Sequence, residues 1–429
     1  MSEIGLVELR SVCTHVVDCP HSTPKWTDSG VVVLRSRNIR NGRLDLAAEP
    51  SSTTEEGFRE RIRRAVPTAG DIVITREAPM GEVCMLPAGL RCCLGQRMVL
   101  LRPDPRKIDG RYLLFALQSP FMQHQILVHE GTGSTVSNLR IPALEALRVP
   151  TPSMEQQHRI AAVLGALDDK IELNRKMNLT LEEMARALFK SWFIDFDGHE
   201  DLVDTEIGPV PRGWRPAKLV EFARSGKHAT TAGPFGSKLT SKHYSPAGVP
   251  VIRGANLSPS FGWFHDDGFV YVPSDYASQL TGNMAYPGDV IFTQRGTLGQ
   301  VGLIPESARY DRYVLSQSQM KLTCAPWVPP VFIFLFFRLP STIARITSNA
   351  VAAGVPHINL GFLREFPLVM PDRGTLERFG AALAPLHARI DTLAREGSTL
   401  SDLRDTLLPK LISGELRVPD AEAALSEAL

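Results

Sequence analysis

The chain has little of what marks a secreted or membrane protein. It has only 6 cysteines in 429 residues, too few for a disulfide framework, so we expect reduced thiols and a cytoplasmic protein. The longest strongly apolar run, Val331 to Phe337, is far shorter than the ~20 residues that span a bilayer. The first ten residues lack the basic start and apolar stretch of a secretory signal.

Net charge is also scarce, because 47 basic and 46 acidic side chains leave only +1. Taken as a sum, this value argues against a nucleic-acid binder. Apolar residues make up 43% and charged residues 22%, which excludes a mostly disordered chain. At roughly 100–200 residues per domain, the length predicts two to four domains.

Signatures of catalysis are missing from the sequence. There is no G-x-x-x-x-G-K-[ST] loop, no G-x-S-x-G or H-E-x-x-H motif, and no Asn-Pro-Pro-aromatic or Asp-Pro-Pro-Tyr run of the kind that adenine methyltransferases use on a flipped base. The glycine-rich segment Gly131–Thr135 lacks a lysine, so it is weak evidence for a nucleotide. We therefore assign no catalytic residue and no cofactor to this chain.

Four potential zinc ligands, Cys13, His15, Cys19 and His21, lie close together in the sequence. Their spacing differs from finger and ribbon patterns, which open with C-x2-4-C. Pro20 interrupts the alternation that would align them on one face of a strand. We favour the alternative, in which these are small buried or half-exposed side chains, and predict no metal site.

The sequence repeats itself at a constant offset, which indicates a tandem duplication. Conserved glycine, arginine, aspartate and glutamine positions mark the repeated segments. The matching pairs are Gly30–Arg35 with Gly248–Arg253, Gly70–Thr75 with Gly288–Thr293, Met80–Val83 with Leu298–Val301 and, after a three-residue slip, Leu94–Gln96 with Leu315–Gln317.

Each repeat predicts a globular domain followed by a long helix. Short β-branched runs bounded by Gly, Pro and Asp predict strands, and Tyr112–His129 and Pro330–Ile346 predict helices within the globular parts. The expected fold is therefore mixed α/β (α+β). The predicted segments are domain 1 (1–152), a central helix and linker (153–203), domain 2 (204–372), and a C-terminal helix and tail (373–429).

The two long helices carry a 4-3 apolar spacing, which is typical of a coiled-coil seam. Ser153 and Gln156 predict a capping box at the start of the first, and Pro385 is expected to kink or delay the start of the second. One helix with an apolar stripe is not stable alone, so we expect an antiparallel pair. Asn174 and Asn178 fall on the seam, where a buried Asn fixes register; a frayed, solvated turn is the alternative. The seam positions are Ile160, Leu164, Leu167, Ile171, Asn174, Asn178, Leu181, Leu386, Ile390, Leu393 and Leu400.

The near-neutral total hides an alternation along the chain. The segments 1–152 and 204–372 carry net charges of +3 and +4, and the helical segments 153–203 and 373–429 carry −4 and −2. A solvated face explains most charge runs. Two copies of the same asymmetry favour two domains that face DNA, joined by helices that do not touch it.

Several of these stretches resemble motifs of the DNA specificity subunit of type I restriction-modification systems, and the resemblance covers nearly the whole chain. The motif-like segments are Gly70–Thr75, Ser134–Leu139, Pro152–Gln157, Ala187–Phe193, Asp195–Asp197, Gly208–Trp214, Pro234–Lys238 and Leu407–Leu416.

The resemblance implies a non-catalytic subunit. Each globular domain would read one half of a bipartite target in double-stranded DNA, and the helices would set the unread spacer. The helices would also dock two methyltransferase subunits, which would carry S-adenosylmethionine, and restriction endonuclease subunits, which would use ATP, could join.

Polar side chains in and around the repeated segments are candidates for DNA contact, because Arg, Lys, Asn and Gln suit base edges and phosphates. Turn chemistry and side-chain-to-backbone bonding stay open as the alternative for each. The candidates are Arg35, Arg37, Asn38, Arg76, Arg97, Lys238, Arg253, Asn256, Gln294 and Arg295. Two other functions also stay open: a methyltransferase or nuclease with an unrecognised motif, and an adaptor that binds only proteins.

Overall fold

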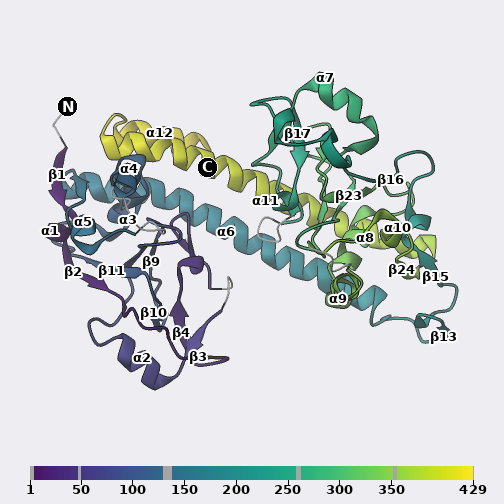
Figure 1. The fold of residues 1–429 in the computed structure, drawn as a ribbon, viewed down its shortest axis with the longest axis horizontal. Helices are drawn as coiled ribbons and strands as arrows, with labels where there is room; N and C mark the ends of the chain where they lie inside the picture. Colours follow the sequence, from purple (N-terminus) through teal and green to yellow (C-terminus); the bar gives the residue numbers. More distant parts are fainter. Residues whose placement is uncertain (1–3, 47–49, 129–137, 258–261, 351–354, 429) are drawn as a thin grey trace. The chain divides into compact units, whose positions relative to one another are not determined.

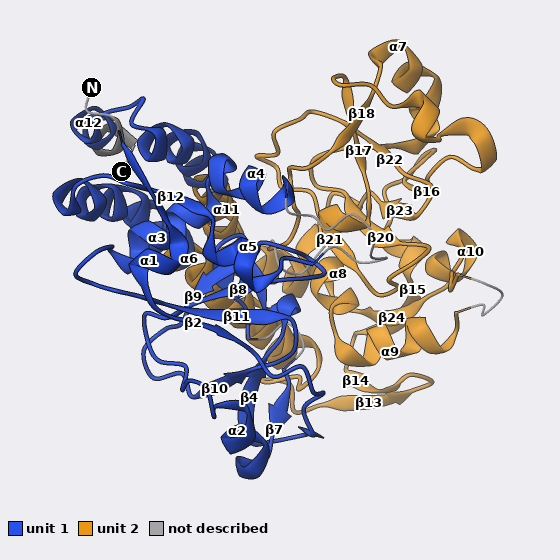
Figure 2. Cartoon of the chain, turned by 60° about the vertical axis from the view of Figure 1, so that its left-hand side comes forward, with its two compact units in different colours: residues 1–172, 398–429 blue, residues 173–397 orange. Residues whose placement is uncertain are grey.

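The computed structural model describes residues 4–46, 50–128, 138–257, 262–350 and 355–428 (Figure 1). They form two compact units, residues 1–172 with 398–429 and residues 173–397 (Figure 2). We call these unit 1 and unit 2. Each unit combines a globular part with one segment of each long helix, α6 (Met154–Phe193) and α11 (Arg373–Ser413). The compact units thus divide the chain differently from the four predicted segments.

Unit 1 contains two four-stranded sheets, two small sheets and several short helices. Its strands are β1 (Gly5–Glu8), β2 (Cys13–Asp18), β3 (Trp26–Thr27), β4 (Val31–Leu34), β5 (Ile39–Arg40), β6 (Arg43–Leu44), β7 (Ser52–Thr53), β8 (Ile72–Thr75), β9 (Val83–Met85), β10 (Cys92–Leu94), β11 (Met98–Pro103) and β12 (Arg148–Thr151). Its helices and turns are α1 (Leu9–Val12), η1 (Ser36–Asn38), α2 (Glu55–Arg61), α3 (Gly110–Gln118), α4 (Pro120–Val128), α5 (Ile141–Glu145) and α12 (Val418–Ala428).

Unit 2 also contains two four-stranded sheets and two small ones. Its strands are β13 (Leu202–Thr205), β14 (Gly208–Pro211), β15 (Arg215–Lys218), β16 (Thr230–Ala232), β17 (Val249–Ile252), β18 (Val270–Val272), β19 (Met284–Ala285), β20 (Val290–Thr293), β21 (Val301–Leu303), β22 (Tyr313–Leu315), β23 (Gln319–Leu322) and β24 (Pro367–Met370). Its helices and turns are η2 (Leu219–Phe222), η3 (Gly236–Lys238), η4 (Ser241–His243), η5 (Gly254–Leu257), α7 (Ser274–Ala277), η7 (Ser278–Asn283), α8 (Pro330–Phe337), α9 (Pro340–Ser348) and α10 (Leu360–Arg364).

The sheet topology repeats between the units. The order β2-β11-β8-β9 in unit 1 corresponds to β16-β23-β20-β21 in unit 2, and the pair β1-β12 corresponds to β15-β24. The second sheet holds one parallel contact in each unit, β4 with β10 and β17 with β22. The edge strands of this second sheet differ between the units. In unit 1, β3 pairs with β7 at one edge of the sheet, whereas in unit 2, β19 pairs with β22 at the opposite edge. The duplication in the sequence is therefore a duplication of the fold.

Proline breaks both of the helices predicted inside the globular parts. The segment predicted as one helix from Tyr112 is α3 followed by α4, which begins at Pro120, and its counterpart is α8 followed by α9, which begins at Pro340. Proline forces the preceding residue out of the helical region and supplies no N–H. The prediction of one helix in each segment was therefore wrong, because each segment breaks at its proline.

The first long helix begins at its predicted cap, and the second begins at a cap that was not predicted. Ser153 Oγ accepts from the Gln156 N–H at 3.3 Å, and the Gln156 side chain approaches the Ser153 N–H at 3.3 Å, which confirms the capping box. Helix α11 begins at Arg373, where Asp372 Oδ1 accepts from the Thr375 N–H at 2.9 Å. The prediction that Pro385 delays the start of this helix was therefore wrong.

Within each unit, the segments of α6 and α11 pack against each other. In unit 1, Leu164 and Leu400 belong to the same buried core, and Arg404 Nη1 lies 2.7 Å from Asp168 Oδ1. In unit 2, the Phe379 ring lies 4.7 Å from the Phe193 ring. A coiled-coil supercoil stays a prediction. The seam residues that are buried are Ile160, Leu164, Leu167, Ile171, Asn174, Ile390, Leu393 and Leu400, and those that are half-buried are Asn178, Leu181 and Leu386.

Helix α6 is continuous through Asn174 and Asn178, so a frayed, solvated turn at this point is excluded. Asn174 is only 2% exposed, and neither of its amide atoms has a hydrogen-bond partner among the described residues. This residue is therefore a buried polar interruption of an otherwise apolar stripe, and such an interruption lowers stability.

Candidate nucleic-acid interface

Asn38 and Asn256 occupy the same buried turn in the two units. Asn38 Oδ1 accepts from the Arg35 N–H at 2.8 Å, and its Nδ2 donates to the Asp45 carbonyl at 2.9 Å. Asn256 Oδ1 accepts from the Arg253 N–H at 2.9 Å. Both side chains are at most 3% exposed. Their assignment as DNA-contacting residues is corrected, because the fold itself engages both amides.

Arg76 is likewise part of the interior of unit 1. Its guanidinium donates to both Asp18 carboxylate oxygens at 3.0 Å, to the Leu139 carbonyl at 2.8 Å and to Asn138 Oδ1 at 3.1 Å. The residue is 8% exposed. A guanidinium with this many partners holds the segment before α5 against the sheet. The prediction that Arg76 contacts DNA is therefore also corrected.

The remaining basic candidates of unit 1 lie at or near its surface. Arg37 is exposed and Arg35 half-buried, with the Arg35 guanidinium 5.3 Å from the centre of the Trp26 ring, which is itself 47% exposed. Arg97 Nε forms a 3.0 Å ion pair with Glu77. An exposed aromatic ring beside basic side chains suits contact with nucleic acid, and Arg35, Arg37 and Arg97 stay proposals.

A polar cleft of about 450 Å³ opens in unit 2, at the ends of β20 and β23. Arg295, predicted as a DNA contact, lines it and is exposed. The other lining residues are small or uncharged polar residues, which suits hydrogen bonding to a ligand more than apolar binding. The cleft is lined by Gly254, Ala255, Thr293, Arg295, Gly296, Thr297, Gln300, Ser318 and Gln319.

Two more candidates flank this cleft in the sequence. Gln294 is half-buried, and its Oε1 has no hydrogen-bond partner in the described part of the chain. Arg253 is half-buried, and its guanidinium donates to the Gly268 carbonyl at 3.2 Å. These contacts do not show that either side chain contacts a DNA base, so DNA contact by Gln294 and Arg253 stays a proposal.

Lys238 is exposed at the end of η3, next to Phe235, which is 73% exposed. The Lys238 carbonyl accepts from the Tyr276 hydroxyl, which fixes the backbone and leaves the ammonium at the surface. An exposed ring and an exposed cation three residues apart match the pattern beside Arg35 in unit 1, although they lie on a different element.

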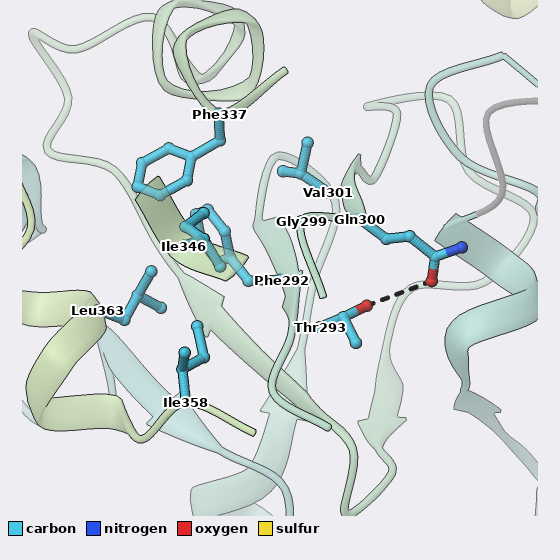
Figure 3. Close-up of a pocket in the computed structure, with 9 residues that line it drawn as sticks. All are labelled: Phe292, Thr293, Gly299, Gln300, Val301, Phe337, Ile346, Ile358 and Leu363. Atoms are coloured by element: carbon cyan, nitrogen blue, oxygen red, sulfur yellow. Dashed lines mark hydrogen bonds between the residues drawn. The ribbon is translucent and has the colours of Figure 1, made fainter. Parts of the chain in front are cut away.

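A second, apolar cavity behind the cleft is almost filled. Its free volume is about 10 Å³, at the lower limit for one water. Figure 3 shows the Phe292, Ile346 and Leu363 side chains gathered together, with Thr293 and Gln300 directed away from them toward each other. The Thr293 hydroxyl lies 3.4 Å from Gln300 Oε1. This cavity is core packing, and the polar side chains on its rim belong to the cleft.

The cysteine and histidine cluster does not converge. Cys13 packs in the core beside α3, whereas Cys19 packs in a second core, where its Sγ accepts from the Met98 N–H at 3.3 Å. Burial raises the pKa of the Cys13 thiol to about 12, which disfavours the thiolate that zinc requires. In the described ranges, no three His, Cys, Asp or Glu side chains lie together in a way that could hold a metal ion.

Two of the sequence segments named above lie wholly or mostly outside the described residues: Gly131–Thr135 and most of the Ser134–Leu139 motif.

Within the described part of the chain, no single helix is both long and apolar enough to cross a membrane, whereas the bent pair α8 and α9 meets the length and composition limits together. The apolar residues of α8 belong to the buried core of unit 2.

Comparison with known proteins shows which proteins this chain resembles. Residues 2–183 match the type I restriction modification DNA specificity domain. The MjaIX type I restriction enzyme specificity subunit of Methanocaldococcus jannaschii is 26% identical over 421 residues, which cover 94% of this chain and 88% of that protein. The HindI specificity subunit of Haemophilus influenzae is 22% identical, over 75% of this chain and 80% of that protein.

A solved structure shares the fold. The S subunit of a type I restriction-modification system from M. genitalium superposes with a TM-score of 0.55 at 17% identity, covering 96% of this chain and 97% of that one. At this identity, the likeness shows that the two proteins share a fold. The chain is similar to type I restriction enzyme specificity subunits over most of its length.

Proposed function

We propose that this chain is the sequence-reading subunit of a type I restriction-modification complex, in which each globular part reads one half of a bipartite DNA target. The observation that carries the proposal is the internal duplication: the two units repeat a sheet topology, and exposed positions at the constant offset differ, as Arg37 and Ala255 do. Two similar folds with different surfaces suit two unlike half-sites.

The long helices would set the distance between the half-sites and dock two methyltransferase subunits. In support, Leu173 and Met184 of α6 are 52% and 49% exposed. They are eleven residues apart, which places them on one helix face at 3.6 residues per turn. An exposed apolar stripe of this kind favours contact with a partner protein.

The chain itself would be non-catalytic. S-adenosylmethionine would be bound by the methyltransferase subunits, and ATP would be used by restriction endonuclease subunits where these join. In support, the sequence holds no Asn-Pro-Pro-aromatic or Asp-Pro-Pro-Tyr run of the kind that adenine methyltransferases use.

Reconstitution tests the proposal. The full chain is purified alone and with a methyltransferase subunit of a type I system, and methyl transfer to duplex DNA is measured. The chain alone is expected to transfer no methyl groups, and the mixture is expected to methylate one defined sequence. Binding to duplex DNA that weakens steeply with salt is expected as well. Salt-independent binding, or none, would instead favour an adaptor that binds only proteins.

A further inference from the structure

Gln319 is a buried amide whose donor has nothing to bind inside the protein. The residue is 0% exposed, and its Nε2 has no hydrogen-bond partner in the described part of the chain. Gln319 Oε1 accepts from the Ser316 hydroxyl, which in turn accepts from the Ser318 N–H at 3.4 Å. This chain of bonds fixes the orientation of the amide, so that Nε2 carries the unpaired protons.

Gln319 is also one of the residues that line the polar cleft of unit 2. A Cβ added to Gly254, another lining residue, would lie 4.0 Å from Gln319 Nε2. Buried amides in native proteins nearly always have a partner. An orphan that lines an open cleft therefore indicates a ligand that supplies an acceptor.

A second donor lies in the same cleft. Arg295 is exposed there, and a guanidinium offers five N–H donors and no acceptor. In the major groove, guanine presents two acceptors, O6 and N7, side by side, whereas adenine presents one acceptor and one donor. Two donors that line one cleft therefore favour guanine.

The equivalent place in unit 1 has a different chemistry. Strand pairing aligns Thr75 with Met98 in unit 1 and Thr293 with Gln319 in unit 2. The threonine is the same in both copies, but the donor amide is replaced by a methionine. At the constant offset, Arg295 corresponds to Glu77. The fold is thus kept while both donors are changed, as expected of positions that determine specificity.

We propose that Gln319 and Arg295 form a guanine-reading site, which contacts O6 and N7 of one G·C pair in the half-site read by unit 2. This inference rests on the proposed function and adds the base, the groove edge and the two side chains that read it. Gln319 would donate through Nε2, and Arg295 would donate through its guanidinium. The site predicts no equivalent guanine preference at this position in unit 1.

The first test compares methylation targets of the intact complex with wild-type chain and with Gln319→Met. Methionine occupies the equivalent position of unit 1, so the fold is known to accept it there. For this variant, we expect the preference for guanine over the other bases to fall roughly 10-fold at one position of one half-site, within the range of a single base contact. The preferences in the other half-site should be unchanged. Arg295→Met should relax the same position.

A base analogue gives an independent readout. Replacement of the contacted guanine by 7-deazaguanine removes N7 alone. Wild-type complex is expected to bind this DNA roughly 10-fold more weakly, whereas Gln319→Met or Arg295→Met should lose less, because one partner of the contact is already missing. Gln317→Met serves as the control: that amide already donates to the Leu239 carbonyl at 2.7 Å, so it should affect stability without relaxing one position.

Each outcome decides the inference. If the wild-type complex methylates a bipartite sequence but both cleft variants keep full discrimination at every position, the guanine-reading site is wrong and the proposed function stands. If the relaxed position is an adenine or lies in the other half-site, the site is also wrong. If the wild-type complex methylates no defined sequence, the proposed function itself fails.

Discussion

Asn38 and Asn256 close the same turn in the two halves of the protein, with Oδ1 accepting from the backbone N–H three residues earlier at 2.8 and 2.9 Å. Each amide also donates to a carbonyl beyond the turn, that of Asp45 or of His265. The duplication has therefore kept the side chains that stabilise the backbone. Other positions vary between the halves, such as Arg295, which stands where unit 1 has Glu77.

Removal of this amide should destabilise unit 2 and leave the recognised sequence unchanged. Asn256→Ala leaves the Arg253 N–H and the His265 and Asp267 carbonyls without their partner, so we expect a loss of about 1–3 kcal/mol in the free energy of unfolding. Asn349→Ala, at an exposed position, should change it by no more than about 0.5 kcal/mol. Denaturant titration measures both, and equal effects would contradict the structural role.

The buried ion pair between Lys321 and Asp289 should contribute strongly to unit 2. Nζ lies 2.7 Å from Oδ2, and both side chains are at most 3% exposed. Lys321→Met leaves a buried carboxylate without its cation, which should cost about 3–5 kcal/mol. The exposed pair of Arg373 and Glu377 provides the control, because Arg373→Met should cost less than about 1 kcal/mol. A small effect at Lys321 would contradict the buried pairing.

Asn174→Leu should stabilise the protein. Both amide atoms of Asn174 are buried without partners in the described structure, and leucine has a similar size and no polar group to desolvate. We expect the melting temperature to rise, since a buried unsatisfied polar group costs about 1–3 kcal/mol. Leu173→Asn, one residue earlier at an exposed position, controls for helix propensity. A lower melting temperature for Asn174→Leu would show that the amide has a partner.

Asp391 should make the stability of unit 2 depend on pH. Burial raises its pKa to about 7; the Arg395 cation opposes this shift, and the Asp266 and Glu306 carboxylates add to it. Burial also lowers the pKa of the neighbouring His387 to about 4. Between pH 3.8 and 7 the unfolded chain loses this proton and the folded chain keeps it, so stability falls as pH rises through this window.

Asp391→Asn removes that dependence. The variant should be more stable than wild type at pH 8, with a difference that shrinks by about 1.4 kcal/mol for each pH unit below 7. Thermal unfolding at pH 8 and pH 5 measures the difference. Asp402→Asn, at an exposed position of the same helix, should show no such trend, and a constant difference between Asp391→Asn and wild type would contradict the raised pKa.

The exposed stripe on α6 should matter for assembly with the methyltransferase. Leu173→Glu with Met184→Glu places two charges on the proposed docking face, and burial of an unpaired charge is unfavourable. We expect at least a tenfold loss of affinity for the methyltransferase subunit, measured by titration, with the melting temperature of the free chain nearly unchanged. A double substitution at the exposed charged positions Glu183 and Lys176 should have a smaller effect. Equal affinities would place the docking face elsewhere.

The repeat and the helical seam were predictable because they are periodic. The fixed offset aligned Thr75 with Thr293, and the seam leucines recur at coiled-coil spacing. The burial of Asn38 and Asn256 was not predictable, since an amide side chain suits both a turn and a base edge. Gln319 was not among the predicted residues because it does not match its counterpart: the offset that pairs Gln96 with Gln317 places it opposite Met98, and strand pairing confirms this alignment.

The central claim is that two copies of one fold read two separate half-sites. Its most direct test is a map of methylated adenines in DNA treated with the complex of this chain and its methyltransferase. The account predicts two short, unlike sequence blocks separated by an unread spacer of constant length, one of them containing the guanine that relaxes in Gln319→Met. A single continuous motif, or methylation without sequence preference, would contradict it.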